Sequence, residues 1–359
     1  MPKLTQKNFR NHDPDDMFGA IAGFSEQITQ ALEISAAGVQ VPKGRTKRVV
    51  VVGMGGSAIG GDMLRSYITG FDDHNGVDIR VSRDYVPPSV SRSDLLVASS
   101  YSGNTEETLD AYNGARKAAG NVFVLTTGGK LARSARGAGY RMLTLPAGLQ
   151  PRAALGYSFF PLLHTLAVRT RLFGDKVAAE TEVGIDETVR LMAKLTKEYS
   201  VGPIAGNPAW DIARAIHGKV PVIYSATERL DTVNVRWRGQ IQENAKHLAF
   251  GSLLPEMNHN EINGWSHPAR LTRNFAAIYL RDKEDHTRVK RRIEITREII
   301  ARSAGETIDV KSRGRSRLAR IFSLVHLGDW VSYYLSSLTG ADPSPVPVIE
   351  DLKGRLKRG

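Results

Sequence analysis

The 359-residue sequence contains no cysteine, few aromatic residues and no long apolar run. Without cysteine, the chain cannot form disulfides, thiolate metal sites, iron–sulfur clusters or a cysteine nucleophile. The most apolar stretch, residues 153–168, is shorter than the roughly 20 residues that a membrane-spanning helix needs. It also contains Pro161 and His164, so we interpret it as a buried helix. The N-terminal residues lack the apolar core of a signal peptide, and we therefore expect a soluble, cytoplasmic protein.

Acidic residues are in the minority, with 37 Asp and Glu against 49 Lys and Arg, which gives a net charge of +12. Such a balance is compatible with a solvated basic surface, with nucleic acid, with an anionic membrane or with small anionic substrates. The basic residues are scattered, and no basic run alternates with the aromatic residues on which single-stranded nucleic acids stack. We expect no nucleic-acid or membrane partner. Phosphorylated metabolites remain the alternative to a merely solvated surface.

Short runs of β-branched residues alternate with segments of helical periodicity along most of the chain. This alternation predicts an α/β fold, in which parallel sheets carry helices on both faces. We expect one such domain at 45–150, after a helical lead-in at 1–44. Two linking helices in 151–200 would connect it to a second domain at 201–340, and a proline-containing tail with a short helix occupies 341–359.

The strands expected in the first domain are 48–53, 77–81, 94–100, 122–126 and 141–145. Those expected in the second are 202–206, 220–224, 275–280 and 306–310. The longest expected helices are 18–34, 153–170, 178–199, 230–246 and 318–338.

A glycine-rich turn, Gly53-Met-Gly-Gly-Ser-Ala58, follows the first expected strand and opens a helix. The free N–H groups and positive dipole end of such a helix favour phosphate. The turn partly matches the dinucleotide pattern G-x-G-x-x-G/A, but no clear acidic residue ends the next strand, where Ser82 and Arg83 come before Asp84. Taken alone, it leaves a dinucleotide site, another phosphate site and a tight packing turn open.

A second loop of similar position favours a phosphate monoester. Ser100, Ser102 and Thr105 follow a strand and precede a helix, so three hydroxyl groups gather beside another helix start. We expect Asn104 to cap that helix and Glu107 to complete a capping box. Hydroxyl groups together with exposed N–H groups can bind a phosphomonoester without a metal, whereas a dinucleotide fold has no need of this loop.

Together, the loops Gly53–Ser57 and Ser100–Thr105 resemble sugar isomerase (SIS) domains. Three further stretches resemble, more narrowly, the bifunctional phosphoglucose/phosphomannose isomerase family: Pro151–Leu155, Glu243–Lys246 and Leu254–Asn260. The similarity continues to Leu352 and Lys353 and so covers nearly the whole chain. This resemblance implies two tandem SIS domains, each a mostly parallel sheet between helices, and a homodimer.

The resemblance also implies the chemistry, a cofactor-free aldose–ketose isomerisation of glucose 6-phosphate, and of mannose 6-phosphate, to fructose 6-phosphate through a cis-enediol(ate). Glu243 would be the base and Arg152 the cation that stabilises the developing oxyanion. His259, donated by the partner subunit, would assist ring opening, and Lys353 would contact the ring oxygen. The substrate phosphate would bind to Gly55, Gly56, Ser57, Ser100, Ser102 and Thr105.

One position departs from the family pattern. Members of the family carry a threonine before a proline near the C-terminus, and its hydroxyl is associated with admitting both C2 epimers. Here Val346 precedes Pro347, so we expect the change to affect mannose 6-phosphate more than glucose 6-phosphate.

Two other functions and a metal site are alternatives to this interpretation. A non-catalytic sugar-phosphate sensor and an isomerase for another phosphorylated sugar would both use the same loops. The spacing of His247, His259 and His267 matches no standard metal motif, so we expect no metal and no other cofactor.

Overall fold

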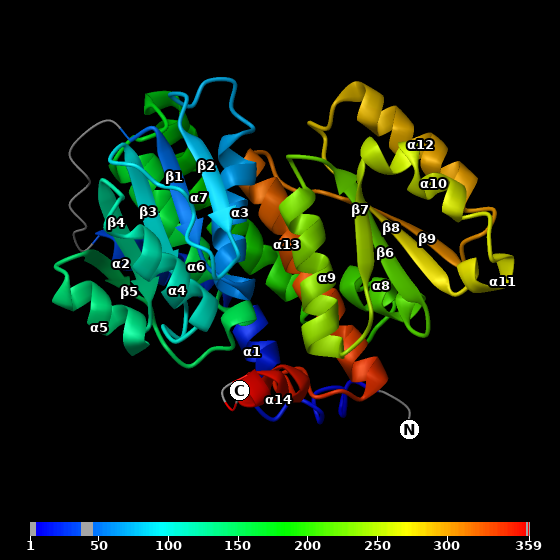
Figure 1. Cartoon of the computed structure of the whole chain (residues 1–359). Coiled ribbons are helices and arrows are strands. Elements are labelled where there is room, and N and C mark those ends of the chain that lie inside the picture. Colours follow the sequence, from blue (N-terminus) through cyan, green and yellow to red (C-terminus); the bar gives the residue numbers. More distant parts are fainter. Residues whose placement is uncertain (1–4, 37–45, 357, 359) are drawn as a thin grey trace.

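The computed structural model describes residues 5–36, 46–356 and 358. Two parallel sheets lie side by side with helices packed around and between them (Figure 1). The α/β class expected from the sequence is therefore confirmed.

Five parallel strands form the first sheet, in the spatial order β2 (Asp78–Ser82), β1 (Arg48–Val52), β3 (Asp94–Ser99), β4 (Asn121–Thr126), β5 (Arg141–Thr144). Alternate residues of β1 face two different apolar cores, because Val49 and Val51 belong to one and Val50 and Val52 to the other. A strand that is buried on both faces has no polar side, which explains its continuous apolar run.

The first two crossover helices leave this sheet on opposite faces. α3 (Gly55–Ile68) follows β1 and packs into one core, whereas α4 (Glu106–Ala115) follows β3 and packs into the other. Since β1 and β3 are neighbours, the chain diverges between their carboxyl ends. Ligands of open α/β sheets bind at such a switch point.

Four parallel strands form the second sheet, in the spatial order β7 (Phe250–Leu254), β6 (Val220–Ala226), β8 (Phe275–Arg281), β9 (Glu306–Lys311). Its helices are α8 (Pro208–Ile216), α9 (Asp231–Ala245), α10 (Glu261–Gly264), α11 (Ala269–Thr272) and α12 (Thr287–Ile300). Strand β7 was not expected from the sequence, because Gly251 and Ser252 interrupt its apolar pattern at the edge of the sheet.

Five further helices share one apolar core with both sheets: α1 (Met17–Ala22), α2 (Phe24–Ala36), α6 (Leu155–Leu163), α7 (Asp175–Tyr199) and α13 (Arg317–Thr339). Almost every residue of α13 is buried, and it packs against α7, α8 and α9. A helix covered on all sides has no polar face, so its apolar residues show little helical periodicity.

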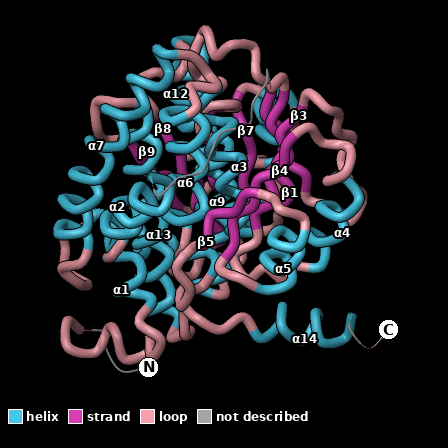
Figure 2. Tube along the Cα trace, turned by 90° about the vertical axis from the view of Figure 1, so that its left-hand side faces the viewer, coloured by secondary structure: helices cyan, strands magenta, loops and turns pink. Residues whose placement is uncertain are grey.

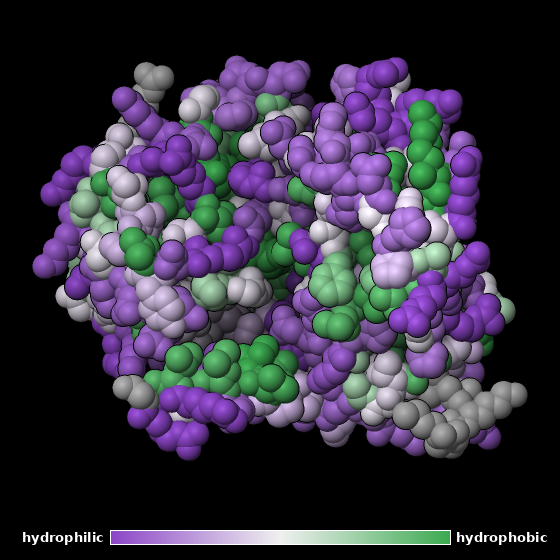
Figure 3. All heavy atoms as spheres, turned by 45° about the vertical axis from the view of Figure 1, so that its right-hand side comes forward, coloured by the Kyte–Doolittle hydropathy of each residue, from purple (hydrophilic) through white to green (hydrophobic). Residues whose placement is uncertain are grey.

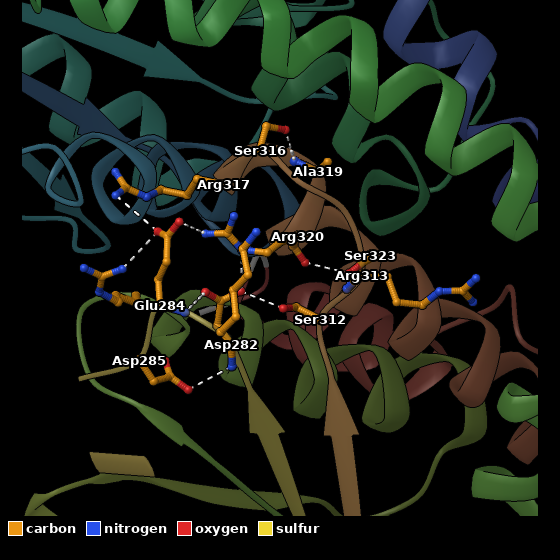
Figure 4. Close-up of polar contacts among 12 residues, drawn as sticks. Asp282, Glu284, Asp285, Ser312, Arg313, Ser316, Arg317, Ala319, Arg320 and Ser323 are labelled. Carbon is orange, nitrogen blue, oxygen red and sulfur yellow. Dashed lines mark hydrogen bonds and ion pairs between the residues drawn. The ribbon is translucent and has the colours of Figure 1, made fainter. Parts of the chain in front are cut away.

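The start of α13 is fixed to the second sheet by a polar cluster (Figure 4). The buried carboxylate of Asp282, directly after β8, accepts hydrogen bonds from Ser312 at 2.6 Å and from Arg320 at 2.9 Å. Glu284 pairs with Arg320 at 2.6 Å and with Arg317 at 3.5 Å. Arg317 also lies over the ring of Phe71, 4.7 Å from its centroid, and so connects this cluster to the first half of the molecule.

Direct contacts also join α3 of the first half to α9 of the second. Arg65 forms an ion pair with Asp231, and the Ser66 hydroxyl donates to the same carboxylate at 3.0 Å. These bonds hold the N-terminal part of α9 beside α3 and so fix the position of one half of the molecule relative to the other.

The C-terminal helix α14 (Pro347–Leu356) is different, because none of its residues is buried. It runs along the lower edge of the molecule, clear of both sheets (Figure 2). Across the described residues, no helix is long and apolar enough to cross a bilayer.

The structure corrects several expected elements. The strand expected at 202–206 is a turn, because Gly202 and Gly206 adopt φ values of +90° and +89° that a strand cannot contain. The helix expected at 18–34 is two helices that meet at Gly23. The helix expected at 153–170 begins at Leu155 and changes at His164 to a π-helix, η2 (His164–Arg169).

Candidate functional site

The glycine-rich turn forms the N-terminus of α3 at the carboxyl end of β1. Gly55 has φ +49°, a left-handed value that favours glycine. The residue before the helix, Met54, offers no side-chain cap, so the first N–H groups of α3 remain available for a ligand. The Ser57 hydroxyl accepts a hydrogen bond from the backbone N–H of Tyr101 at 2.9 Å and so ties this turn to the second loop.

The serine-rich loop stands at the start of α4, next to the first turn. Ser100 is buried, and its hydroxyl lies 3.0 Å from that of Thr105. Ser102 is exposed. The predicted capping box is wrong, because Thr105 is the N-cap and makes no capping bond. Asn104 instead accepts from the Lys130 N–H at 3.1 Å, which leaves the N-terminal N–H groups of α4 free of side-chain caps.

Arg152 lies in the short 3₁₀ helix η1 (Pro151–Ala153), between the two halves. Its guanidinium is almost fully buried and donates to Asn244 Oδ1 at 2.6 Å, to the Ser344 carbonyl at 2.8 Å and to the Pro343 carbonyl. Burial lowers its pKa, with the nearby Glu243 carboxylate opposing the shift. Because the guanidinium is planar and its acceptors are fixed, the cation is held in one orientation.

Backbone contact joins Arg152 to the glycine-rich turn. A Cβ atom on Gly56 would lie 2.6 Å from the Pro151 carbonyl oxygen and 3.1 Å from the Arg152 nitrogen. Only a glycine allows this approach, so the turn and the arginine are parts of one rigid unit.

Glu243 is in the last turn of α9, and its Oε2 lies 3.4 Å from Arg152 Nη1. Its side chain is 35% exposed, so one side remains accessible to a ligand. A cavity of about 510 Å³ is lined by Glu243, Lys246, Val346 and Pro347, among others. The position that differs from the family pattern, Val346, therefore shares a cavity with the expected base.

Sequence reasoning missed several residues that organise this region. The Lys246 ammonium donates to the Asp342 carbonyl, and burial together with Arg152 lowers its pKa. The buried pair of Arg236 and Asp329, at 2.8 Å, supports Arg152 because Arg236 also donates to the Arg152 carbonyl at 3.0 Å. The Glu-Asn-Ala-Lys stretch pointed to Lys246, but no sequence signal connects Asp329 with Arg152.

The chain does not bring His259 to this site. Gln242 donates to the Ala249 carbonyl at 2.8 Å, so the last turn of α9 lies beside the start of β7. His259 belongs to η3 (Glu256–His259), which follows the other end of β7, and five strand residues span about 13 Å. Figure 1 accordingly shows α10, which follows His259, at the opposite end of the second sheet from the C-terminus of α9.

Lys353 is exposed on α14 and, within the described residues, makes no hydrogen bond or ion pair with the other expected site residues. The structure therefore assembles the glycine-rich turn, the serine-rich loop, Arg152 and Glu243, and leaves His259 and Lys353 outside. In the described part of the chain, no three His, Asp or Glu side chains cluster as metal ligands would.

Known proteins resemble this chain along most of its length. Residues 205–356 match the family model of the bacterial phospho-glucose isomerase C-terminal SIS domain. A bifunctional phosphoglucose/phosphomannose isomerase from Caldicellulosiruptor bescii is 41% identical over 343 residues, which cover 95% of this chain and 98% of that protein. The chain belongs to the bifunctional phosphoglucose/phosphomannose isomerase family.

Other relatives show how widely the scaffold is used. A protein from Sulfolobus acidocaldarius named D-glucosamine-6-phosphate 4-epimerase is 33% identical over 222 residues, 61% of this chain and 64% of that one. Among solved structures, the C-terminal domain of glucosamine-fructose-6-phosphate aminotransferase from Francisella tularensis has a TM-score of 0.70 at 15% identity. It covers 92% of this chain and 98% of that chain, and it shows the same fold.

Proposed function

We propose that the protein is a cofactor-free aldose–ketose isomerase that interconverts glucose 6-phosphate, and mannose 6-phosphate, with fructose 6-phosphate. The observation that carries this proposal is the juxtaposition of Arg152 and Glu243 at 3.4 Å, directly beside the glycine-rich turn at the start of α3. A carboxylate and a fixed cation next to a phosphate site are what proton transfer on a sugar phosphate needs. Membership of the family supports the same reaction.

The reaction moves one proton between C2 and C1 of the open-chain sugar. Glu243 takes the proton from C2 of glucose 6-phosphate, and the electron pair forms the C1–C2 double bond of the enediolate. The resulting carboxylic acid returns the proton to C1, while the hydroxyl proton on O2 passes to O1. General base catalysis of this kind typically contributes about 100- to 10,000-fold.

The negative charge that develops on the enediolate oxygen would face the Arg152 guanidinium. Because hydrogen bonds to Asn244 and Ser344 already fix that guanidinium, it need not reorganise during the reaction. Preorganised charges of this kind often supply the largest electrostatic contribution to catalysis.

The phosphate would bind across both loops at the switch point of the first sheet. We assign it to the N–H groups and hydroxyls of Gly55, Gly56, Ser57, Ser100, Ser102 and Thr105. The uncapped starts of α3 and α4 support this assignment, since two helix dipoles then favour one dianion. A doubly charged sugar phosphate does not cross a bilayer, which supports the cytoplasm as the compartment of this enzyme.

Substitution of Glu243 by Gln tests the proposed base. The variant should bind fructose 6-phosphate normally but lose turnover by at least about 100-fold, because the amide cannot accept the proton. Glu298→Gln, on the exposed face of α12, removes the same charge outside the site and should keep the rate of the unchanged protein. A normal rate in the Glu243→Gln variant would refute the assignment of Glu243 as the base.

We further propose a homodimer in which His259 of one subunit completes the site of the other, with Lys353 contacting the sugar ring. Two observations support a partner. His259 is separated from Glu243 of its own chain by the length of β7. In addition, α14 exposes Val348, Leu352 and Leu356 as an apolar strip (Figure 3), and such patches mark interaction surfaces.

Mixing two inactive variants tests this exchange. Glu243→Gln and His259→Ala homodimers should regain activity when their subunits are unfolded together and refolded. Random pairing gives half heterodimers, each with one intact site of two, so about a quarter of the full activity is expected. Activity that stays at the level of the separate variants would refute the donation of His259.

Another phosphorylated sugar is the second candidate substrate, because a 33% identical relative is named for glucosamine 6-phosphate. A coupled assay with EDTA separates these possibilities by scoring glucose 6-phosphate and mannose 6-phosphate formed from fructose 6-phosphate, with glucosamine 6-phosphate run in parallel. Binding of fructose 6-phosphate without either product would favour the sensor function instead. The division at residues 150 and 200 into two domains and linking helices stays part of the proposal.

A further inference from the structure

A second cavity lies in the first half of the molecule, far from the switch point. Its volume is about 440 Å³, and it is formed where β4 and β5 begin, beside the end of α4 and the π-helix η2. The phosphate turn and the serine loop lie at the carboxyl ends of β1 and β3. Because all strands of this sheet run in the same direction, the cavity lies at their amino ends and the candidate active site at their carboxyl ends.

Four cations line this cavity and no acid does. They are Arg92, Arg116, Lys117 and Arg141. Among the described residues none of the four forms an ion pair, and the remaining residues of the chain contain no Asp or Glu. The carboxylate at the start of β3, Asp94, is already bound to Arg48 at 2.6 Å. Four like charges that share a cavity repel one another unless an anion joins them.

Several buried polar atoms of the lining have no hydrogen-bond partner within the described structure. They are Thr165 Oγ1, Arg116 Nε and Arg141 Nη1. Thr165 is only 3% exposed, and its hydroxyl cannot be satisfied by solvent at the surface. Leaving such a group unpaired costs about 1–3 kcal/mol, so three in one cavity indicate a missing partner. Thr165 also lies in a π-helical segment, a geometry that is often retained at functional sites.

The rest of the wall is apolar, with Leu95, Phe123 and Leu166 among the lining residues. The size is in the range of small-molecule sites, and a combination of apolar wall and convergent charges is typical of them. We propose that this cavity binds a small organic diphosphate, whose two phosphoryl groups match the four cations and whose carbon skeleton lies on the apolar wall. This inference is independent of the proposed isomerase activity.

Titration calorimetry of the full-length protein tests the site, with pyrophosphate as the probe and orthophosphate for comparison. Pyrophosphate should bind at least about tenfold more tightly than orthophosphate, since it engages more of the cations. The double substitution Arg116→Gln/Arg141→Gln should weaken pyrophosphate binding by at least about tenfold. The matched control Arg133→Gln/Arg136→Gln removes two exposed charges from α5 (Gly129–Gly137), outside the cavity, and should change it less than twofold.

Three results would overturn the proposal. One is equal weakening by both double substitutions, which would mean that only net charge matters. Another is pyrophosphate binding that survives the loss of Arg116 and Arg141 but disappears in Ser102→Ala, because the ion would then occupy the serine loop. The third is no pyrophosphate binding at all. Circular dichroism of each variant verifies that it is folded, and Arg116→Lys, which keeps the charge, should retain most of the affinity.

Discussion

Replacing Gly56 by Ala probes the contact that joins the glycine-rich turn to Arg152. The added Cβ would lie 2.6 Å from the Pro151 carbonyl oxygen, 2.9 Å from the Pro151 carbonyl carbon and 3.1 Å from the Arg152 nitrogen. Ordinary contacts of this kind begin at 3.4 Å, so the backbones must separate by nearly an ångström. Neither partner is a flexible side chain that could turn aside.

The two sides of this contact have little freedom to move. Arg152 is held by Asn244 and by the carbonyls of residues 343 and 344, whereas the turn is held by the hydrogen bond between Ser57 and Tyr101. We expect the variant to lose about 1–3 kcal/mol of unfolding free energy, as overpacked sites do. A displacement of this size between phosphate and catalytic groups should also lower kcat/KM about 100-fold.

Steady-state assay of fructose 6-phosphate and urea unfolding measure both effects. Gly137→Ala is the matched control, because its Cβ meets nothing within 4 Å and its φ is not left-handed. It should leave both quantities almost unchanged. Wild-type kcat/KM and stability in Gly56→Ala would show that the turn and Arg152 are not one rigid unit, and would refute this reasoning.

Three further predictions concern other parts of the molecule. Val346→Thr should raise the rate with mannose 6-phosphate relative to glucose 6-phosphate, since the hydroxyl would enter the cavity of Glu243; an unchanged ratio of rates in the coupled assay would contradict this. Arg152→Lys keeps the charge but loses the fork that binds Asn244 and Ser344, so kcat should fall about 100- to 1,000-fold, and a normal kcat would argue against oxyanion stabilisation. Burial raises the pKa of Asp285 from its ordinary 3.8 to about 6, so the folded chain holds this proton in a pH range where the unfolded chain has lost it. The free energy of unfolding should therefore fall by up to about 3 kcal/mol as pH rises from about 4 to 6, and Asp285→Asn should remove that fall. Urea titrations at pH 4 and pH 6 measure the change, and an equal fall in the variant would count against the assignment.

The sequence predicted most of the fold because local patterns determine most of it. Buried parallel strands such as Val49–Val52 read as apolar runs, and the turns after β1 and β3 carry the small residues that a helix start needs. Strand β7 was missed, since an edge strand is buried only in part and tolerates Gly251 and Ser252. The strand expected at 202–206 failed because Asn207 satisfies the Tyr199 and Gly202 carbonyls, which favours a turn there.

The candidate site could be predicted from the sequence only in part. Short-range motifs indicated the two candidate phosphate loops, and the family resemblance supplied Arg152 and Glu243, which the structure brings to 3.4 Å. The support around Arg152 could not be foreseen, because Asp329 acts on it only through Arg236, and 93 residues separate Arg236 from Asp329. No local pattern encodes such a contact, and it depends on how α9 and α13 pack.

The bonds of Arg152 also have a consequence for biosynthesis. Its guanidinium needs the carbonyl of Pro343, and 191 residues separate the two positions. During translation, the first sheet can therefore be complete while this arginine still lacks its acceptors. Since contacts between such distant segments form late in folding, the proposed catalytic centre should stay unassembled on the nascent chain until nearly all of the protein has left the ribosome.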